Sequence, residues 1–379
     1  MHNEESFVFS RIKEFDSNDF MIWEGRTFSY SWLYNKVNLF SDLLKNKHIQ
    51  SGSIVGIDAD YSPSVIALLL SLIKNKNIIV PLTSAKDEQK KEFEKISNVQ
   101  YIFSFNTDDN FNVDATKNKI ANELLIKIID DDEPGLVLFS SGSTGKSKAI
   151  LHNFLKLIKK FEQQKHGYRT LVFLLLDHIG GINTLFYVLS NGGTIVYTKS
   201  RNPEDICKSI EKYKVELLPT TPTFLNLLLI SEQYKKHDLS SLKVISYGTE
   251  VMPQTTLERL HELFTNVKLQ QTYGLSELGI LHSKSKDSDS LLMKIGGEGF
   301  ETKVVDNKLW IKADSAMLGY LNASNPFDKD GWFNTSDLVE VEGDYIKVLG
   351  RESEIINVGG QKVYPSHPIQ RTVTVARKF

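Results

Sequence analysis

The sequence predicts an α/β protein with open, mostly parallel sheets and a smaller antiparallel or barrel-like part near its C-terminal end. Short apolar segments of strand length alternate with amphipathic segments of helix length along most of the chain. This alternation is typical of parallel α/β sheets. After Gly296 the pattern changes to strands and turns, such as Lys303–Val305 and Lys308–Ala313. Because the chain has 379 residues, two or more subdomains are expected.

The individual elements are predicted from apolar periodicity and from turn residues. Strands are expected at Ser53–Asp58, Asn77–Pro81, Gly135–Phe139, Thr170–Leu176, Thr194–Tyr197 and Lys243–Tyr247. Helices are expected at Ser62–Ile73, Asn153–Gln164, Pro222–Glu232 and Pro253–Phe264. The last strand ends at Leu349-Gly350-Arg351, so we predict a main domain over residues 1–350 and a remnant over residues 351–379, too short to fold alone.

Net charge, cysteine count and the length of apolar stretches exclude several classes of protein. Lys and Arg number 45 against 47 Asp and Glu, a net charge of −2, so no attraction of the whole chain to nucleic acid or anionic membranes is expected. The single cysteine, Cys207, allows no internal disulfide and is expected to be a buried apolar residue. The longest apolar stretch, Val65–Ile73, is shorter than the ~20 residues of a membrane span. These features predict a cytoplasmic protein without a membrane span.

A loop rich in glycine, hydroxyl and lysine residues, Ser140–Ala149, follows an expected strand and is expected to precede a helix. Glycines let backbone N–H groups approach an anion, hydroxyls add donors, and two lysines supply positive charge. A Walker-type loop is excluded because Ser140 stands where its first glycine is required, and no Gly-x-Ser-x-Gly elbow of serine hydrolases occurs here. A polar surface loop is the remaining alternative, against which the preceding strand and the lysine pair count.

This loop resembles the ATP-gripping loop of the adenylate-forming (AMP-binding) superfamily, which includes acyl-CoA synthetases, luciferases and peptide-synthetase adenylation domains. The superfamily pattern is Ser/Thr-Ser/Thr-Gly-Ser/Thr-Thr-Gly-x-Pro-Lys-Gly, and here Ser147 replaces the proline and Ala149 the last glycine. The resemblance implies catalytic roles for Lys148 and Thr144. It implies that ATP is bound by Ser140, Ser141, Gly142, Ser143, Thr144, Gly145 and Lys148.

Two further segments resemble nucleotide-binding motifs of the same superfamily. Gln271–Glu277 is similar to its Tyr-Gly-x-Thr-Glu segment, which implies that Tyr273 stacks on adenine beside Gly274 and that Ser276 meets the α-phosphate. It also implies that Glu277 is a catalytic residue that holds Mg²⁺. Mg²⁺ prefers hard oxygen ligands and is usually shared with phosphates. Ser246–Glu250 is similar to the adenine-binding strand end, which adds Gly248, Thr249 and Glu250 to the expected nucleotide site.

The later segments extend the resemblance to the ribose and the acyl group. Gly331–Leu338 resembles Gly-Trp-Phe-x-Thr-Gly-Asp-Leu, which implies that Asp337 accepts hydrogen bonds from the ribose hydroxyls and that Ser336 replaces a glycine. Gly350–Pro365 resembles the hinge before the C-terminal lid, where Arg351 would reach the ribose. Leu176–Gly181 resembles a segment lining the acyl pocket, which implies a pocket role for His178, although a lone histidine is also often structural.

The resemblance spans Phe28–Pro365 and implies a large N-terminal adenylate-forming domain of two open α/β sheets plus a small β-barrel-like part. It implies activation of a small-molecule carboxylic acid by ATP and Mg²⁺ to an acyl-adenylate, with CoA as the expected acceptor or a carrier-protein thiol in its place. The lid is expected to be mostly absent, because no Gly-Lys signature occurs in Ser366–Phe379. Three alternatives stay open: a lid supplied by a separate chain, a non-catalytic nucleotide-binding module, and amino-acid adenylation for a carrier protein.

Overall fold

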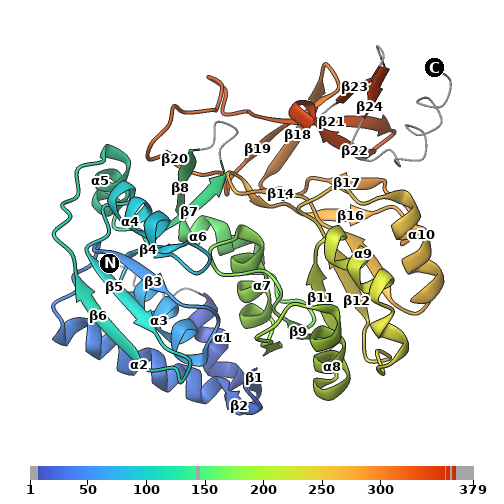
Figure 1. Ribbon diagram of the computed structural model, residues 1–379. Coiled ribbons are helices and arrows are strands. Elements are labelled where there is room, and N and C mark those ends of the chain that lie inside the picture. The colour runs from blue at the N-terminus through green and yellow to red at the C-terminus, as the bar shows by residue number, and fades with distance from the viewer. Residues whose placement is uncertain (1–6, 142–145, 355, 359–360, 364–379) are drawn as a thin grey trace. The chain divides into compact units, whose positions relative to one another are not determined.

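The computed structural model describes residues 7–141, 146–354, 356–358 and 361–363 (Figure 1). The chain divides into two compact units. The first contains Met1–Arg201 with the short segments Ser276–Gly279 and Ser315–Asn325, and the second contains the rest. Both units combine helices with sheets, which confirms the predicted α/β class. These two units do not test the predicted domain boundary after residue 350, which stays a prediction.

A seven-stranded sheet forms the centre of the first unit, with the order β20-β8-β7-β4-β3-β5-β6. The inner pairs β5–β3, β3–β4 and β4–β7 are parallel, while β6, β8 and β20 are added antiparallel at the two sides. The strands are β3 (Ile54–Asp58), β4 (Ile78–Pro81), β5 (Tyr101–Phe105), β6 (Phe111–Ala115), β7 (Gly135–Ser141), β8 (Ser147–Asn153) and β20 (Gly319–Tyr320).

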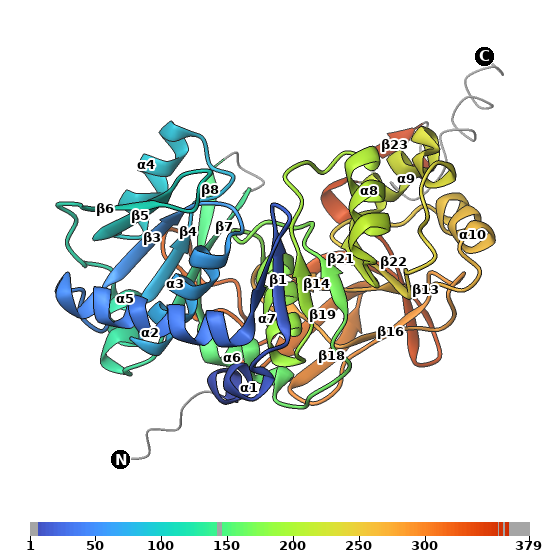
Figure 2. The same ribbon diagram turned by 90° about the horizontal axis from the view of Figure 1, so that it is seen from below.

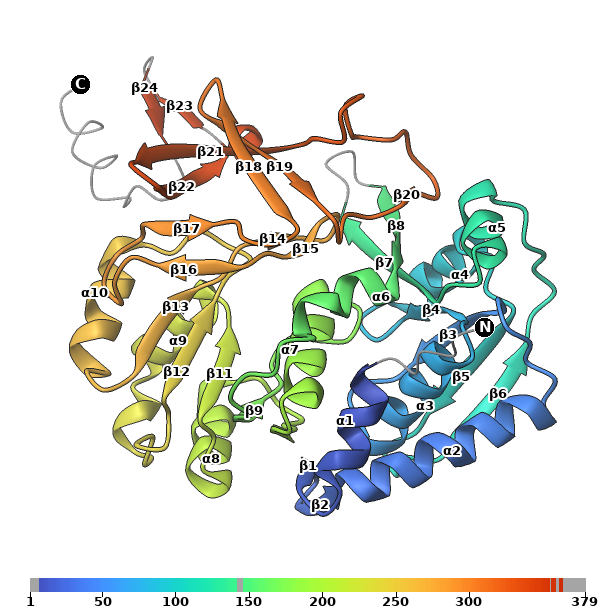
Figure 3. The same ribbon diagram turned by 180° about the vertical axis from the view of Figure 1, so that it is seen from behind.

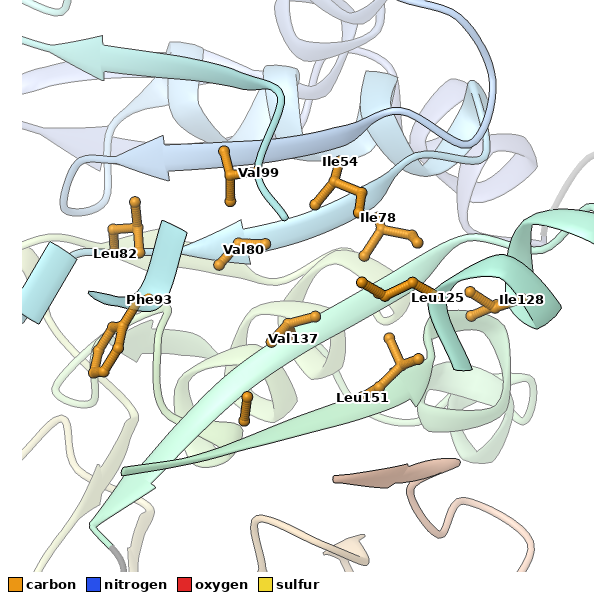
Figure 4. Close-up of a cluster of buried hydrophobic side chains, with 11 residues drawn as sticks. Ile54, Ile78, Val80, Leu82, Phe93, Val99, Leu125, Ile128, Val137 and Leu151 are labelled. Carbon is orange, nitrogen blue, oxygen red and sulfur yellow. The ribbon is translucent and has the colours of Figure 1, made fainter. Parts of the chain in front are cut away.

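Helices cover both faces of this sheet. Helices α4 (Asp87–Ile96) and α5 (Glu123–Asp130) lie over one face, where Phe93 and Leu125 join a buried apolar cluster with β4, β7 and β8 (Figure 4). Helix α3 (Pro63–Lys74) packs with α2 (Tyr30–Asn46) away from that cluster (Figure 2). Every α3 residue from Pro63 to Ile73 is buried, which explains the apolar stretch in the sequence. Among the described residues, no helix has the length and apolarity to cross a membrane.

A second group of strands in the first unit comprises β9 (Arg169–Leu171), β10 (Thr194–Val196), β1 (Asp19–Trp23) and β2 (Arg26–Ser29). β9, β10 and β1 are parallel and β2 is antiparallel. The expected strand Thr170–Leu176 is wrong beyond Leu171, because the chain there turns towards α7 (Ile179–Ser190). The expected helix Asn153–Gln164 is shorter than predicted. The other elements of this unit are α1 (Phe7–Phe15), α6 (Phe154–Ile158) and η1 (Lys159–Phe161).

The second unit begins with three parallel strands that alternate with helices (Figure 3). Cys207, in the helix Pro203–Tyr213, is fully buried, as predicted. The strands are β11 (Leu217–Thr220), β12 (Val244–Tyr247) and β13 (Lys268–Gln271). The helices are α8 (Pro203–Tyr213), α9 (Pro222–Ser231), η2 (Gln233–Lys235) and α10 (Gln254–Leu263).

An antiparallel six-stranded sheet follows, with the order β16-β17-β22-β21-β19-β18, which confirms the predicted antiparallel part. It begins earlier than predicted, because β16 and β17 precede Gly296. Its strands are β16 (Ser283–Ser285), β17 (Met293–Ile295), β18 (Phe300–Val305), β19 (Lys308–Ala313), β21 (Phe333–Glu342) and β22 (Tyr345–Arg351). The remaining short elements are β14 (Gly274–Leu275), β15 (Gly279–Ile280), η3 (Glu352–Glu354), β23 (Ile356–Val358) and β24 (Gln361–Val363).

Candidate functional site

The predicted phosphate loop joins two antiparallel strands. β7 and β8 pair from Gly135↔Asn153 to Ser141↔Ser147, and Ser140 lies opposite Lys148. The expectation that a helix follows the loop directly is therefore wrong: β8 comes first, and α6 begins after Asn153, whose side chain accepts a hydrogen bond from the Lys156 N–H. Four residues predicted to contact ATP lie outside the described residues, namely Gly142, Ser143, Thr144 and Gly145.

Strand β20 fixes the start of β8 from its other side. The Leu318 N–H donates to the Leu151 carbonyl at 2.7 Å, and the Leu321 N–H donates to the Ala149 carbonyl at 2.9 Å. The Asn322 side chain accepts from the Ala149 N–H and donates to the Ser147 carbonyl, both at 2.9 Å. Because backbone groups on both sides of Lys148 are bonded, this lysine starts from a well-fixed backbone position.

Lys148 and Glu277 both contact Tyr320. The Lys148 ammonium nitrogen lies 4.9 Å from the centroid of the Tyr320 ring, and the Tyr320 hydroxyl donates to Glu277 Oε1 at 2.8 Å. Burial raises the pKa of Tyr320 above its ordinary value, and the adjacent Glu277 adds to this effect, so the hydroxyl stays a neutral donor. The structure thus brings together two predicted catalytic residues, and it adds a tyrosine to which the sequence analysis assigned no role.

The backbone of Ser276–Leu278 is held by three donors of the same unit. The Met317 N–H donates to the Glu277 carbonyl at 2.8 Å, and the Ser315 hydroxyl donates to the Leu278 carbonyl at 2.7 Å. The third donor is His152 on β8, whose Nε2 lies 2.6 Å from the Ser276 carbonyl oxygen. Three successive carbonyls are therefore fixed, and with them the position from which the Glu277 side chain projects.

His152 is fully buried, and burial lowers its pKa to about 4, while the carbonyls of Ser276 and Ser315 act in the opposite direction. The imidazole is therefore neutral near pH 7, with Nε2 protonated so that it can donate to Ser276. Sequence reasoning missed this residue. Its only signal in the sequence is its position directly after the apolar segment Ala149–Leu151.

The second unit contains a pocket of about 440 Å³ at the carboxyl ends of β12 and β13 and beside the β21–β22 pair. Six residues predicted to bind the nucleotide line it, while Gly248 and Ser276 do not. The lining consists of Thr249, Glu250, Val251, Gln271, Thr272, Tyr273, Gly274, Leu275, Asp337, Val348, Gly350 and Arg351.

Tyr273, Asp337 and Arg351 form a polar cluster in this pocket. The Tyr273 hydroxyl donates to Asp337 Oδ2, and Arg351 Nε lies 3.5 Å from Asp337 Oδ1. Asp337 and Arg351 face each other across β21 and β22, which explains why the motif residues meet although they are distant in the sequence. Burial, reinforced by Asp337, raises the pKa of Tyr273 well above its ordinary value, so Tyr273 is a neutral donor.

The backbone around the pocket has two unusual features. A Cβ at Gly248 would lie 2.4 Å from the Thr272 hydroxyl oxygen, so the ends of β12 and β13 approach each other closely there. Thr249 (φ 71°) and Ser336 (φ 60°) adopt the left-handed conformation, which favours glycine. Glu250 Oε2 accepts from the Thr223 N–H at 3.1 Å, so the Glu250 carboxylate also fixes the first turn of α9.

His178 has a structural role that the sequence left open. It precedes α7, and its Nδ1 accepts a hydrogen bond from the Gly180 N–H at 3.0 Å, so it caps the helix. Burial lowers the pKa of His178, which favours the neutral ring that this acceptor role requires. The predicted role of His178 in an acyl pocket stays a prediction.

The residues around Glu277 fit a magnesium ion. Within the described ranges, no group of three His, Cys, Asp or Glu side chains is placed to hold a metal. Mg²⁺ does not require such a group, since it is often held by one or two carboxylates together with water and substrate phosphates. Glu277 offers a carboxylate oriented by Tyr320, in the same unit as strands β7 and β8 that flank the predicted phosphate loop.

Comparison with known proteins gives the family. Residues 9–321, more than half of the chain, match the family "AMP-binding enzyme". This chain belongs to the AMP-binding enzyme family. Among curated proteins, it is 29% identical to 4-coumarate–CoA ligase-like 9 of Arabidopsis thaliana, over 62% of this chain and 48% of that protein. It is 28% identical to indoleacetate–CoA ligase of Aromatoleum aromaticum, over 62% of this chain and 50% of that protein. It thus spans about half the length of these relatives.

Solved structures of other proteins share the fold. The anthranilate CoA ligase AuaEII in complex with anthranoyl-AMP superimposes with a TM-score of 0.77 at 17% identity, covering 95% of this chain and 80% of that chain. ATP-bound MatB from Rhodopseudomonas palustris gives a TM-score of 0.74 at 18% identity, covering 95% and 81%. At these identities the similarity establishes the fold of the family member and leaves its chemistry to be argued from its own residues.

Proposed function

We propose that this member of the AMP-binding family uses ATP and Mg²⁺ to convert a carboxylic acid into its acyl-adenylate, for thioester formation with CoA. One observation carries the proposal: six of the residues expected at a nucleotide line one pocket of about 440 Å³. That volume suits a ligand of nucleoside size. The names of the curated relatives, which are CoA ligases, support CoA as the acceptor.

In the first step, a carboxylate oxygen attacks the α-phosphorus of ATP, and the bond to the β-phosphate oxygen breaks to release pyrophosphate. Two anions must meet, so the barrier is largely electrostatic. Mg²⁺, when held by Glu277, supplies positive charge to the phosphates. Lys148 faces the strand end at Ser140 and is expected to bind a phosphate oxygen. Bound to a phosphate oxygen, its ammonium would stabilise the negative charge that develops on the phosphates.

The polar cluster of the second unit is expected to bind the nucleoside. Asp337 has two acceptor oxygens for the ribose hydroxyls, and Arg351 places a positive charge 3.5 Å from this buried side chain. The Tyr273 hydroxyl donates to the other oxygen of Asp337, which orients the tyrosine ring at the pocket wall.

In the second step, the CoA thiolate attacks the acyl carbon and AMP leaves as the phosphate monoester.

The test is carboxylate-dependent exchange of labelled pyrophosphate into ATP over a panel of aryl, indole, fatty and amino acids. Lys148→Ala should lower the exchange rate about 10²–10³-fold, since one charged stabiliser is lost. Lys127→Ala is the matched control, because this exposed lysine on α5 of the same unit pairs with Asp131. ATP binding without pyrophosphate exchange for any acid would refute the proposed enzymatic activity and leave a nucleotide-binding module. Exchange with amino acids alone would favour a carrier-protein thiol as acceptor.

A further inference from the structure

Two oppositely charged side chains, Lys148 and Glu277, contact different parts of Tyr320. The Lys148 ammonium lies against the face of the Tyr320 ring, and the Glu277 carboxylate accepts from the Tyr320 hydroxyl. Among the described residues, neither Lys148 nor Glu277 forms an ion pair with any partner. Opposite charges beside the same aromatic ring attract each other, so the side chain between them bears on whether they pair.

Tyr320 is held rigidly between these charges. It pairs with Ile150 across β20 and β8, and the residues on either side of the short strand, Leu318 and Leu321, donate to β8 carbonyls at 2.7 and 2.9 Å. Only 7% of Tyr320 is exposed, so its ring has little freedom to change rotamer. The partner Glu277 is fixed as well, because the carbonyls of Ser276, Glu277 and Leu278 are all hydrogen-bonded.

The ring face and the hydroxyl of Tyr320 interact with its two charged neighbours in different ways. The ring face attracts a cation without neutralising it. The hydroxyl is a neutral donor that occupies one carboxylate oxygen and orients the other. The Lys148 ammonium therefore contacts the ring and not the Glu277 carboxylate, and Glu277 has a second oxygen that can bind a hard cation. A direct Lys148–Glu277 ion pair would neutralise both groups instead.

We infer that Tyr320 is a positioning residue that keeps Lys148 and Glu277 apart, so that the lysine binds a phosphate and the glutamate binds the accompanying divalent cation. This inference rests on the proposed function, because it assigns ATP·Mg²⁺ to the site. Removing the hydroxyl should weaken the cation site alone. Removing the whole ring should also weaken metal-free nucleotide binding, because Lys148 can then pair with Glu277.

The experiment measures binding separately from turnover. Mn²⁺ serves as a spectroscopic probe, and its affinity in the presence of ATP is followed by electron paramagnetic resonance. ATP affinity without metal is measured by calorimetry in EDTA. Three variants are compared with the unaltered chain: Y320F, Y320L and the control Y187F. Tyr187 lies on α7 of the same unit, and its hydroxyl donates to the His166 carbonyl at 2.9 Å, so Y187F makes the same chemical change elsewhere.

Y320F should weaken Mn²⁺ binding in the presence of ATP about tenfold and leave metal-free ATP affinity unchanged, since one hydrogen bond to a charged group is lost. Y320L should weaken both affinities, and Y320L/E277Q should recover the metal-free ATP affinity because the competing carboxylate charge is gone. Y187F should change neither. In pyrophosphate exchange, Y320F should raise the Mg²⁺ concentration needed for half-maximal rate and change kcat at saturating Mg²⁺ far less.

Equal Mn²⁺ affinities for Y320F and the unaltered chain would overturn the inference while leaving the proposed function intact. Equal losses for Y320F and Y187F would also overturn it, because the effect would then be general loosening of the unit. If the unaltered chain binds neither ATP nor Mn²⁺ with ATP, both the inference and the proposed function fail.

Discussion

Acid should destabilise the first unit through one buried histidine. His152 is fully buried, and its pKa is lowered from 6.5 to about 4, mainly by burial. The unfolded chain therefore binds this proton more tightly than the folded chain. The stability that depends on a neutral His152 is fully present above pH 6.5 and is lost as the pH falls from 6.5 towards 4. Proton linkage through this group alone lowers the free energy of unfolding by about 2.5 kcal/mol at pH 4.5 and by about 3 kcal/mol at pH 4.

The matched perturbation is His152→Gln, which cannot titrate but carries an amide donor near the position of Nε2. Urea unfolding is measured from pH 7.5 to 4.5 in a background in which Trp310 and Trp332 are replaced by Phe. The remaining tryptophans, Trp23 and Trp32, both lie in the first unit, so their fluorescence reports that unit alone. The free energy of unfolding of the variant should fall by about 2.5 kcal/mol less over this range than that of the parent.

His166→Gln controls for the loss of any histidine from the first unit, because the His166 side chain is exposed. Parallel stability curves for His152→Gln and its parent would refute the reasoning. Such a result would mean that the folded unit admits a charged imidazole, either through water or through rearrangement of the Ser276 segment. Nuclear magnetic resonance titration of the His152 ring would show the same outcome directly, as a pKa near 6.5 instead of about 4.

Three further changes test the backbone and the nucleoside pocket. Gly181→Ala should lower the free energy of unfolding by about 2 kcal/mol or more in urea titrations, because its Cβ would lie 1.8 Å from the Leu175 carbonyl oxygen; an unchanged midpoint would contradict this close approach. Ser336→Gly should raise stability by about 0.5 kcal/mol, since relief of the left-handed conformation exceeds the added chain entropy; a loss would show that the serine is not strained. Asp337→Asn should weaken ATP binding about 10- to 100-fold by calorimetry, whereas an unchanged affinity would remove Asp337 from the nucleotide site.

The fold class could be predicted because it depends on the periodicity of apolar residues, which can be read from the sequence without knowing which residues are in contact. Strands such as Ile78–Pro81 and Lys308–Ala313 were located within a residue, since apolar runs and turn residues mark their ends. The strand Ser147–Asn153 was missed. A short apolar run fits a buried strand or a helix equally well, and only its pairing with β7 decides between them.

The candidate site was predicted in part, through motifs in which residue types and spacing carry the chemistry. Thr249, Tyr273, Asp337 and Arg351 do line one pocket. Their hydrogen bonds could not be predicted in the same way. The bond from Tyr273 to Asp337 joins residues 64 positions apart, and it depends on the strand register that places Asp337 opposite Arg351.

Residues that support other residues are the hardest to find in a sequence. His152 and Tyr320 touch the predicted machinery from β8 and β20, and neither carries a spacing rule that signals such a role. A histidine inside an apolar strand is ordinarily a satisfied core residue, and a tyrosine after a glycine is ordinarily a turn. What distinguishes these two is that both restrain the same short segment, one through the Ser276 carbonyl and the other through the Glu277 carboxylate. Their effects should therefore be coupled, so His152→Gln and Y320F combined should alter Mn²⁺ affinity by an amount that differs from the sum of the separate changes in free energy.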